Sequence, residues 1–240
     1  MELNIGVEKD KINWSGYEWI TQERWGKIHK DKPWNWYDPE CVNVDNWGYL
    51  HLETHKNPKQ FKDIESQYGV GLISSVDDFD YGYFEIECKL PTGKKLWPAF
   101  WMWSGPWPPE IDIFEGYTDN RQGYLKFNRF NPLGWWNTPS NIWTHKKETG
   151  GVVNLRPRTG FSGFKDPSKH FIKYSCYWTE DIIQIKHNGY IVREINDPKT
   201  LKHFKDKKMN IIINNHFQPN PPEGNNYSDF VIKYFNYVPL

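Results

Sequence analysis

Three carboxylates in one short segment are the most informative feature of this 240-residue chain. Glu110, Asp112 and Glu115 lie within residues 110–115, shortly after the aromatic-rich segment 96–103. Like charges at close range repel, and burying them costs free energy, so such a cluster does not serve stability. Hydrolysis of a glycosidic bond, however, uses two carboxyl groups across the bond, and sugar rings bind well on aromatic faces. The cluster therefore predicts a site that cleaves sugar chains, in preference to an exposed acidic face of a strand.

The spacing of the three carboxylates makes a structural demand on the strand. Alternate residues of a strand point to the same face, so Glu110 and Asp112 share a face. Glu115 is at an odd offset from Glu110 and would point to the opposite face of a regular strand. A β-bulge around Phe114 adds one residue and restores the phase. We therefore predict a bulge, together with strong curvature of the sheet, because a flat strand would hold the carboxyl groups too far apart for a retaining mechanism.

Several segments of the chain resemble glycoside hydrolase family 16, which includes laminarinases, lichenases, agarases and carrageenases. The Trp-Pro-Ala-Phe-Trp-Met run that starts at Trp97, followed by the Glu-Ile-Asp-Ile-Phe-Glu segment 110–115, looks like the family signature. The bulged form of that segment resembles the laminarinase and galactanase branch. Further similarity lies in residues 71–91 and 170–190, whereas residues 131–169 match nothing in the family.

The resemblance implies a role for each carboxylate. Glu110 would be the nucleophile and Glu115 the general acid/base, and Asp112 between them would tune both. Clustered carboxylates cannot all ionise cheaply, so we expect at least one to hold a proton near neutral pH.

Substrate-binding candidates follow from strand phase and from the resemblance. Trp101 and Trp103 share one strand face, opposite Phe100 and Met102, so that one pair lines a groove and the other lies in the core. Other candidates resemble family positions, flank the strands or lie in the unmatched segment; the full set is Trp97, Trp101, Trp103, Trp107, Glu85, Asn128, Arg129, Trp135, Trp136, Asn214 and His216. For any single tryptophan the alternative is core packing. Lichenases have Asn-x-Trp where this chain has Asn214 and His216. The resemblance therefore does not predict which sugar binds at that position.

Composition and patterning predict the architecture. Alanine occurs once, at Ala99, and no long window shows the period of a helix. Short alternating strands separated by Gly, Pro and Asn turns are frequent, as in the run that leads to the hairpin signal Asn188-Gly189. We therefore predict an all-β jelly-roll sandwich of two stacked antiparallel sheets with a concave cleft, formed by residues 1–240 as a single domain. A short helix is expected near residues 198–205, and residues 131–168 are expected to form a long loop beside the cleft.

Charge and cysteine content limit the partners. The formal net charge is zero, which does not indicate binding to nucleic acid or to an anionic membrane. The expected partner is the polysaccharide substrate, and the protein is expected to be a monomer. No cofactor is expected to be required, and a structural Ca²⁺ enters only by family analogy. His51, Glu53 and His55 alternate on a probable strand, but a solvated strand face is favoured over a metal site, so no metal is predicted. The three cysteines cannot all pair, and Cys88 and Cys176 are expected to be buried and free.

Location and substrate remain open at the level of sequence. The first residues lack the basic and apolar regions of a signal peptide, yet a polysaccharide substrate points to an extracellular, cell-surface or virion-associated protein. The predicted function is a retaining endo-acting hydrolase of a β-1,3 or mixed β-1,3-1,4 glucan. One alternative is a hydrolase of a galactan, sulfated or not, such as agar, porphyran or carrageenan; a sulfated galactan is favoured if arginines such as Arg129 and Arg156 converge on the groove. Another is a non-catalytic sugar-binding jelly roll.

Overall fold

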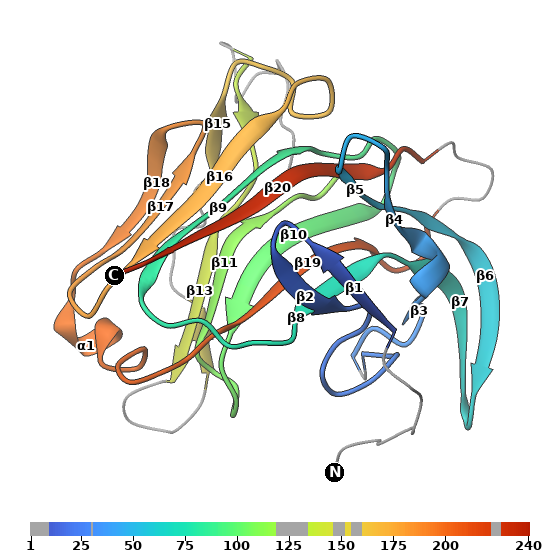
Figure 1. The fold of residues 1–240 in the computed structure, drawn as a ribbon, viewed down its shortest axis with the longest axis horizontal. Helices are drawn as coiled ribbons and strands as arrows, with labels where there is room; N and C mark the ends of the chain where they lie inside the picture. Colours follow the sequence, from blue (N-terminus) through green and yellow to red (C-terminus); the bar gives the residue numbers. More distant parts are fainter. Residues whose placement is uncertain (1–9, 30, 119–133, 146–151, 155–159, 222–226) are drawn as a thin grey trace.

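The protein is described here by a computed structural model, which describes residues 10–29, 31–118, 134–145, 152–154, 160–221 and 227–240. Two large sheets stack on each other, and their strands run alongside one another across the molecule (Figure 1). The eight-stranded sheet has, in spatial order, β1 (Lys11–Trp14), β2 (Tyr17–Ile20), β8 (Leu72–Ser75), β19 (Asn210–Phe217), β10 (Leu96–Trp103), β11 (Glu110–Glu115), β13 (Asn141–His145) and β14 (Val152–Asn154).

The opposing sheet has seven strands. Their spatial order is β18 (Tyr190–Ile195), β17 (Ile183–His187), β16 (Ile172–Trp178), β9 (Gly82–Lys89), β20 (Phe230–Pro239), β5 (Leu50–Leu52) and β4 (Val42–Val44). All pairings within the two large sheets are antiparallel, as the sequence predicts.

Two smaller sheets complete the described structure. One contains β3 (Asn35–Tyr37), β7 (Ile64–Val70) and β6 (Thr54–Phe61); β3 and β7 pair in parallel, which the prediction of purely antiparallel sheets did not include. The other joins β12 (Trp136–Asn137) to β15 (Phe161–Gly163). The described helices are a 3₁₀ turn, η1 (Pro39–Cys41), and α1 (Pro198–Leu201), which lies where a short helix is predicted. Neither has the length and apolar character that crossing a membrane requires.

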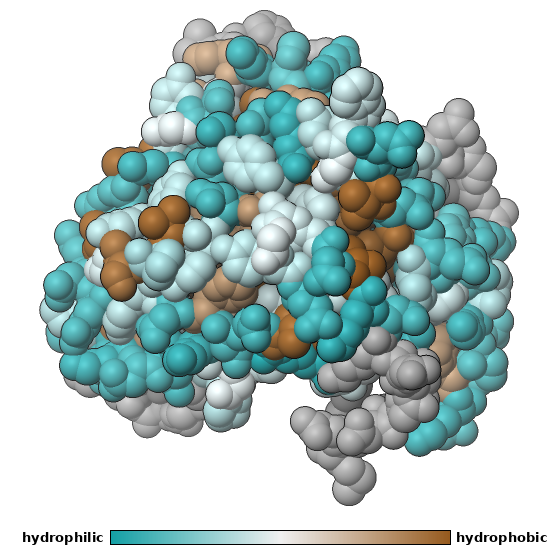
Figure 2. Space-filling view, viewed as in Figure 1, coloured by the Kyte–Doolittle hydropathy of each residue, from teal (hydrophilic) through white to brown (hydrophobic). Residues whose placement is uncertain are grey.

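The main core fills the space between the two large sheets. Strict alternation produces it: Phe84, Ile86 and Cys88 of β9 face Phe100 and Met102 of β10. Burying a large apolar side chain contributes roughly 1.5–3 kcal/mol, so this alternation fixes which face of each strand is inward. The opposite face of β10 and β19 carries a second, smaller core that includes Leu96, Ile212 and Phe217, and the half-buried Trp101 and Trp103 pack against it. The surface seen in Figure 2 is mostly hydrophilic, with hydrophobic residues in small separate groups.

Local turn chemistry supports the same arrangement. Asn188 and Gly189 have φ values of 50° and 83° and form the two-residue turn between β17 and β18, as predicted. The three cysteines, Cys41, Cys88 and Cys176, are free and buried.

Candidate active site

The three carboxylates share one face of β11 because the strand contains a bulge. Trp101 pairs with Asp112 and Phe100 pairs with Phe114, which leaves Ile113 without an opposite residue on β10. The predicted bulge is therefore confirmed, with its extra residue at Ile113, next to the expected position. Ile113 and Phe114 both lie in the main core. The two consecutive inward residues return the strand to the phase in which its next residue, a glutamate, faces outward.

Glu110 and Asp112 lie side by side on this face and are held by tryptophans. The indole Nε1 of Trp107 donates to Glu110 Oε2 at 2.7 Å, and that of Trp143 donates to Asp112 Oδ2 at 3.1 Å. Burial is the main cause that raises the pKa of Glu110, to about 7, and the charge of Glu115 adds to it. Burial and the two neighbouring glutamates raise the pKa of Asp112 well above its usual range. The cluster thus holds at least one proton near neutral pH.

Glu115 is buried, with 8% of its surface exposed, and three donors surround it. Tyr117 Oη donates to Oε1 at 2.8 Å and Trp97 Nε1 donates to the same oxygen at 3.1 Å. Asn141 Nδ2 donates to Oε2. These contacts fix the carboxyl group in one orientation at the end of β11, where it meets β10 and the segment that leads into β13.

Half-buried tryptophans extend from the carboxylates along β10. Trp101 Nε1 donates to Asn214 Oδ1 at 2.8 Å, and Trp103 Nε1 donates to Asn210 Oδ1 at 3.1 Å. Phe100 lies on the core face instead, so the predicted division of β10 into a groove face and a core face is confirmed. The flat faces of these indoles form a surface on which a sugar ring can stack.

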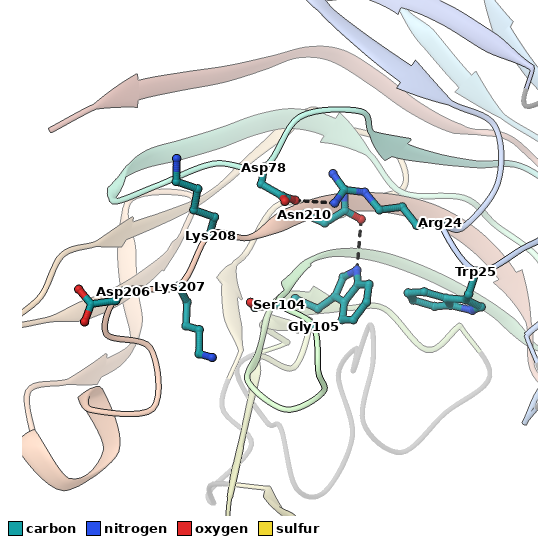
Figure 3. Close-up of a pocket in the computed structure, with 10 residues that line it drawn as sticks. Arg24, Trp25, Asp78, Ser104, Gly105, Asp206, Lys207, Lys208 and Asn210 are labelled. Carbon is teal, nitrogen blue, oxygen red and sulfur yellow. Dashed lines mark hydrogen bonds and ion pairs between the residues drawn. The ribbon is translucent and has the colours of Figure 1, made fainter. Parts of the chain in front are cut away.

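A hollow of about 490 Å³ lies at the end of β10 that pairs with Glu110. Figure 3 shows Trp25 at one side of it, Arg24 beside Asp78, and Lys207 and Lys208 directed to opposite sides. Arg24 Nη1 and Asp78 Oδ1 are 2.6 Å apart, so that this arginine charge is already paired. The hollow has both ring surfaces and hydrogen-bonding groups, which suits a sugar unit.

The polar residues buried under the cleft include His216, which is a substrate-binding candidate from the sequence, and Glu23, which no sequence pattern marks. His216 is buried and stacks on Tyr37, with ring centroids 5.5 Å apart, and its edge meets Trp97 at 6.4 Å. Glu23 is fully buried against the Tyr37 hydroxyl, and burial raises the pKa of its carboxyl to about 8, an effect to which the charge of Glu110 adds. No local pattern marks Glu23, because its neighbours come from distant parts of the chain.

Burial also governs His216 itself. Burial is the main cause that lowers the pKa of His216 well below its usual range, and the positive charge of Lys32 lowers it further. Lys32 Nζ lies 4.6 Å from the Trp97 ring centroid, on the cleft side of the same group. Neutral His216 therefore supports the tryptophan as a packed ring, without adding charge to the cleft.

Two sets of sequence predictions need correction. Glu85 was placed beside the catalytic strand, but it belongs to β9 of the seven-stranded sheet and faces away from the core. There it bonds to Tyr83 and Tyr234 and pairs with Lys173 at 3.2 Å, so it is not part of the cleft. The error arose because β9 precedes β10 in the chain, whereas the two strands lie in different sheets.

The segment expected to be a long loop contributes strands. Its described parts form β12, β13, β14 and β15, and β13 pairs with β11 and supplies Asn141 and Trp143 to the carboxylates. Trp135 and Trp136 lie on the β12–β15 pair, where Trp135 meets Phe161 edge-on at 6.5 Å. Their capping of the cleft remains a prediction. Asn128, Arg129 and Arg156 lie outside the described residues.

Comparisons with known proteins agree with this geometry. The family model "Glycosyl hydrolases family 16" matches residues 29–234. The chain is 28% identical over 123 residues, 48% of its length, to the Endo-1,3-1,4-beta-glycanase EglC of Rhizobium meliloti, and 41% identical over 54 residues, 20% of its length, to a Beta-1,3-glucan-binding protein of Penaeus monodon. These matches span only 22% and 15% of those two relatives.

The fold is also that of solved enzyme structures. A LamA variant from Zobellia galactanivorans, crystallised with laminaritriose and laminaritetraose, has a TM-score of 0.66 and 18% identity, covering 85% of this chain and 83% of the other. That likeness concerns the fold, while the family model extends over most of the sequence and includes the carboxylate strand. This chain belongs to glycosyl hydrolases family 16.

Proposed function

We propose that the protein is a retaining endo-acting hydrolase of a β-linked polysaccharide, most simply a β-1,3 or mixed β-1,3-1,4 glucan. The observation that carries the proposal is the set of three mutually repelling carboxylates on one face of a bulged strand, beside half-buried tryptophans. The similarity to the Endo-1,3-1,4-beta-glycanase EglC supports the choice of a β-1,3-1,4-linked substrate.

Each carboxyl group then has a defined task. Glu110, ionised, attacks the anomeric carbon, while Glu115 gives its proton to the oxygen that leaves, and the C–O bond between the two sugars breaks. A glycosyl ester on Glu110 results. Glu115, now a carboxylate, removes a proton from a water molecule that attacks the same carbon, and Glu110 is released.

Asp112 acts as a positioning residue between the two glutamates. Its raised pKa keeps its proton, and the protonated carboxyl hydrogen-bonds to Glu110, an interaction that lowers the pKa of Glu110 against the effect of burial. A neutral Asp112 thus helps Glu110 to ionise without adding a third negative charge.

Single substitutions test the assignment. We expect Glu110→Gln and Glu115→Gln each to lower kcat on soluble laminarin or lichenan by about a thousandfold or more, with the fold retained, because each removes one of two essential groups. The measurement is the release of reducing ends, with circular dichroism as the check on folding. Glu85→Gln is the matched control and should keep nearly full activity, because Glu85 lies on the other sheet. Turnover near the wild-type rate in either cleft variant would refute the mechanism.

The stereochemistry gives an independent test. Proton NMR during hydrolysis should show the β-anomer as the first product, since two displacements restore the configuration. Azide should rescue Glu110→Gly with formation of an α-glycosyl azide, and should rescue Glu115→Gly with formation of a β-glycosyl azide. An inverted first product would exclude Glu110 as nucleophile.

A non-catalytic glucan-binding protein is the second candidate, and the match to the Penaeus monodon protein favours it. The two functions differ in one measurement. A binding protein would be retained on a gel that contains laminarin and would release no reducing ends. Its Glu110→Gln variant would bind laminarin as well as the wild type does.

We also propose that the protein acts as a monomer outside the cell, at a cell surface or on a virion, where polysaccharide is met. Light scattering of the purified chain tests the first statement, and fractionation of the producing cells or particles tests the second. Dimers at micromolar concentration, or activity confined to the cytosolic fraction, would contradict these two proposals.

A further inference from the structure

Asp38, Cys41 and His55 form a compact cluster where the chain leaves β3 and passes through η1 beside β6. His55 Nε2 lies 3.3 Å from Asp38 Oδ2, while Cys41 Sγ lies 3.3 Å from His55 Nδ1 and 3.9 Å from His55 Nε2. Within the described ranges it is the one group of three or more His, Cys, Asp or Glu residues whose ligand atoms all lie within 4.8 Å of one another. None of the three takes part in the contacts of the cleft described above.

These separations are close to the edges of a zinc coordination tetrahedron. With the usual bond lengths to Zn²⁺, a tetrahedral site places sulfur and nitrogen ligands about 3.6 Å apart, and nitrogen and oxygen ligands about 3.4 Å apart. The observed 3.9 Å and 3.3 Å differ from those values by a few tenths of an ångström. Cys41 Sγ lies nearer to Nδ1 than to Nε2, so a site on Nε2 also requires a rotation of the imidazole ring that turns Nε2 toward the sulfur. One ligand atom from each of the three residues already lies within 4.8 Å of the others.

The electrostatic surroundings favour a cation. Burial and then the charges of Asp38, Glu53, Glu40 and Asp229 raise the pKa of the Cys41 thiol. The same negative potential attracts a divalent cation, and a bound cation stabilises the thiolate so that the proton is lost on binding. Cys41 would therefore be an inert thiol without metal and a ligand with it.

The neighbouring residues fix the Asp38 carboxylate and leave the cluster accessible from one side. Asn57 Nδ2 donates to Asp38 Oδ2 at 2.9 Å and the Glu40 backbone N–H donates to Oδ1 at 3.1 Å, which fixes the carboxylate. Gly69 packs against the pair, since a Cβ there would lie 2.8 Å from Asp38 Oδ2 and 3.1 Å from His55 Nε2. The His55 side chain is 40% exposed, and a hollow of about 590 Å³ reaches Asp38 and Asn57 from the surface.

Two lysines line that hollow, and both are engaged elsewhere. Lys27 Nζ lies 3.6 Å from Asp10, and Lys59 Nζ lies 4.3 Å from the ring centroid of Trp36. Neither is a described contact of the three candidate ligands, so their charges weaken the attraction for a cation without occupying its place.

We propose that Asp38, Cys41 and His55 bind one Zn²⁺ ion, with a water molecule from the hollow as the fourth ligand. Binding releases the thiol proton of Cys41 and any proton on His55 Nε2 to solvent. The ion joins η1 to β6, and so ties the segment that enters the seven-stranded sheet to the three-stranded sheet. The competing interpretation is an ion pair of Asp38 with His55, in which Cys41 is only a buried thiol.

This set differs from the one considered in the sequence. His51 pairs instead with Asp45 and Asp229, and Asn43 donates to Glu53, so only His55 of that trio reaches the cluster. Asp38 and Cys41 join His55 through the course of the chain around η1, which spacing within one strand cannot show.

Cobalt substitution tests the proposal on the untagged 240-residue chain after treatment with a chelator. We expect Co²⁺ to bind with one equivalent per chain and to give a near-ultraviolet thiolate-to-cobalt band together with the visible bands of a tetrahedral ion. Zn²⁺ should displace the Co²⁺ and raise the melting temperature. Coordination without a thiolate band, or binding of Co²⁺ no tighter than that of a denatured chain, would overturn the proposal.

Matched substitutions separate a metal site from an ion pair. Cys41→Ser and His55→Gln should each weaken Zn²⁺ binding at least about tenfold and abolish the thiolate band, whereas Cys176→Ser, which alters a buried thiol in the main core, should leave both unchanged. His55 is partly exposed, so its variant is expected to fold even if a change at buried Cys41 does not. Equal Zn²⁺ affinity in wild type and His55→Gln would show that the cluster is only an ion pair.

Discussion

Glu23 shows how a single residue beneath the cleft ties the stability of the protein to pH. Its carboxyl is fully buried, and burial raises its pKa from 4.5 to about 8. Between these two values the folded protein keeps a proton that the unfolded chain has lost. The unfolding free energy must then fall as pH rises through this window, because the native state binds more protons than the unfolded state.

Replacing Glu23 by glutamine should remove this contribution. We expect wild-type unfolding free energy to decline between pH 5 and pH 8, and Glu23→Gln to gain roughly 2 kcal/mol relative to wild type over the same interval. Urea unfolding at several pH values measures the difference, with Glu65→Gln at an exposed position as the control for losing one charge. Parallel pH profiles for wild type and Glu23→Gln would show that Glu23 is ionised in the native state.

At the residue scale, sequence reasoning succeeds where chemistry is local. Glu110, Asp112 and Glu115 lie within six positions, and the apolar interleaving, the flanking tryptophans and the family resemblance make that spacing selective. Glu23 and Asn141 could not be found in that way. Their importance comes from contacts with residues far away in the chain, and each has the sequence context of an ordinary polar residue.

Among the elements, β19 links the cleft tryptophans to the rest of the eight-stranded sheet. Asn210 Oδ1 accepts from Ser74 Oγ at 2.8 Å and from Trp103 Nε1 at 3.1 Å, while its Nδ2 donates to Ser75 Oγ at 2.7 Å. One buried amide thus joins three neighbouring strands, β8, β19 and β10. A network of this kind fixes side-chain orientation as well as stability.

Removing that amide should be costly. We expect Asn210→Ala to lower the unfolding free energy by roughly 3 kcal/mol, because it leaves buried hydroxyl and indole groups without partners. Urea unfolding at constant pH gives the value. The exposed Asn236→Ala change on β20 is the control and should stay within about 0.5 kcal/mol of wild type. A similarly small effect for Asn210→Ala would mean that water replaces the amide.

The alternation of residues along a strand made the bulge beside the carboxylates predictable. It did not predict that further strands extend the sheet beyond β11. The bulge at Ile113 follows from an odd offset between two residues that must share a face. The strands β13 and β14 were expected as loop, because segments as short as Val152–Asn154 carry too few residues to show an alternation. The pairing of β13 with β11, and of β14 with β13, is decided by the edge of the sheet, a tertiary feature.

For the whole molecule, the balance of charge bears on the substrate. The formal net charge is zero and the sequence pI is about 7.1. No long-range attraction is therefore expected between the protein and an uncharged glucan, and salt has little to screen. A sulfated galactan would instead need local cationic contacts that salt weakens.

Salt dependence can therefore distinguish the two substrate classes. We expect kcat/KM on laminarin to change less than about twofold between about 0.05 and about 0.5 M NaCl. Activity on a sulfated galactan, if present, should fall severalfold over the same range. Initial rates at low substrate concentration give both values, and a strong loss with salt on laminarin would contradict the assignment to a neutral glucan.

The overall architecture was largely accessible from alternation and turn residues, which specify two packed antiparallel sheets. The order of the strands was not. Glu85 illustrates the limit: alternation on β9 correctly turns it away from the core, yet gives no information on which sheet β9 joins. Sheet membership depends on pairings between strands far apart in the chain, such as β9 with β16 and β20.

The indole N–H groups along the cleft have a consequence for recognition. Those of Trp97, Trp101, Trp103, Trp107 and Trp143 all donate to side chains of the protein. Under the proposed function, an oligosaccharide would meet the exposed parts of their rings, which contact C–H groups and are indifferent to where individual hydroxyls point. Selection among glucans would then depend on whether the curvature of the sugar chain follows the row of rings, so that a bent β-1,3 linkage and a straight β-1,4 linkage are told apart by shape.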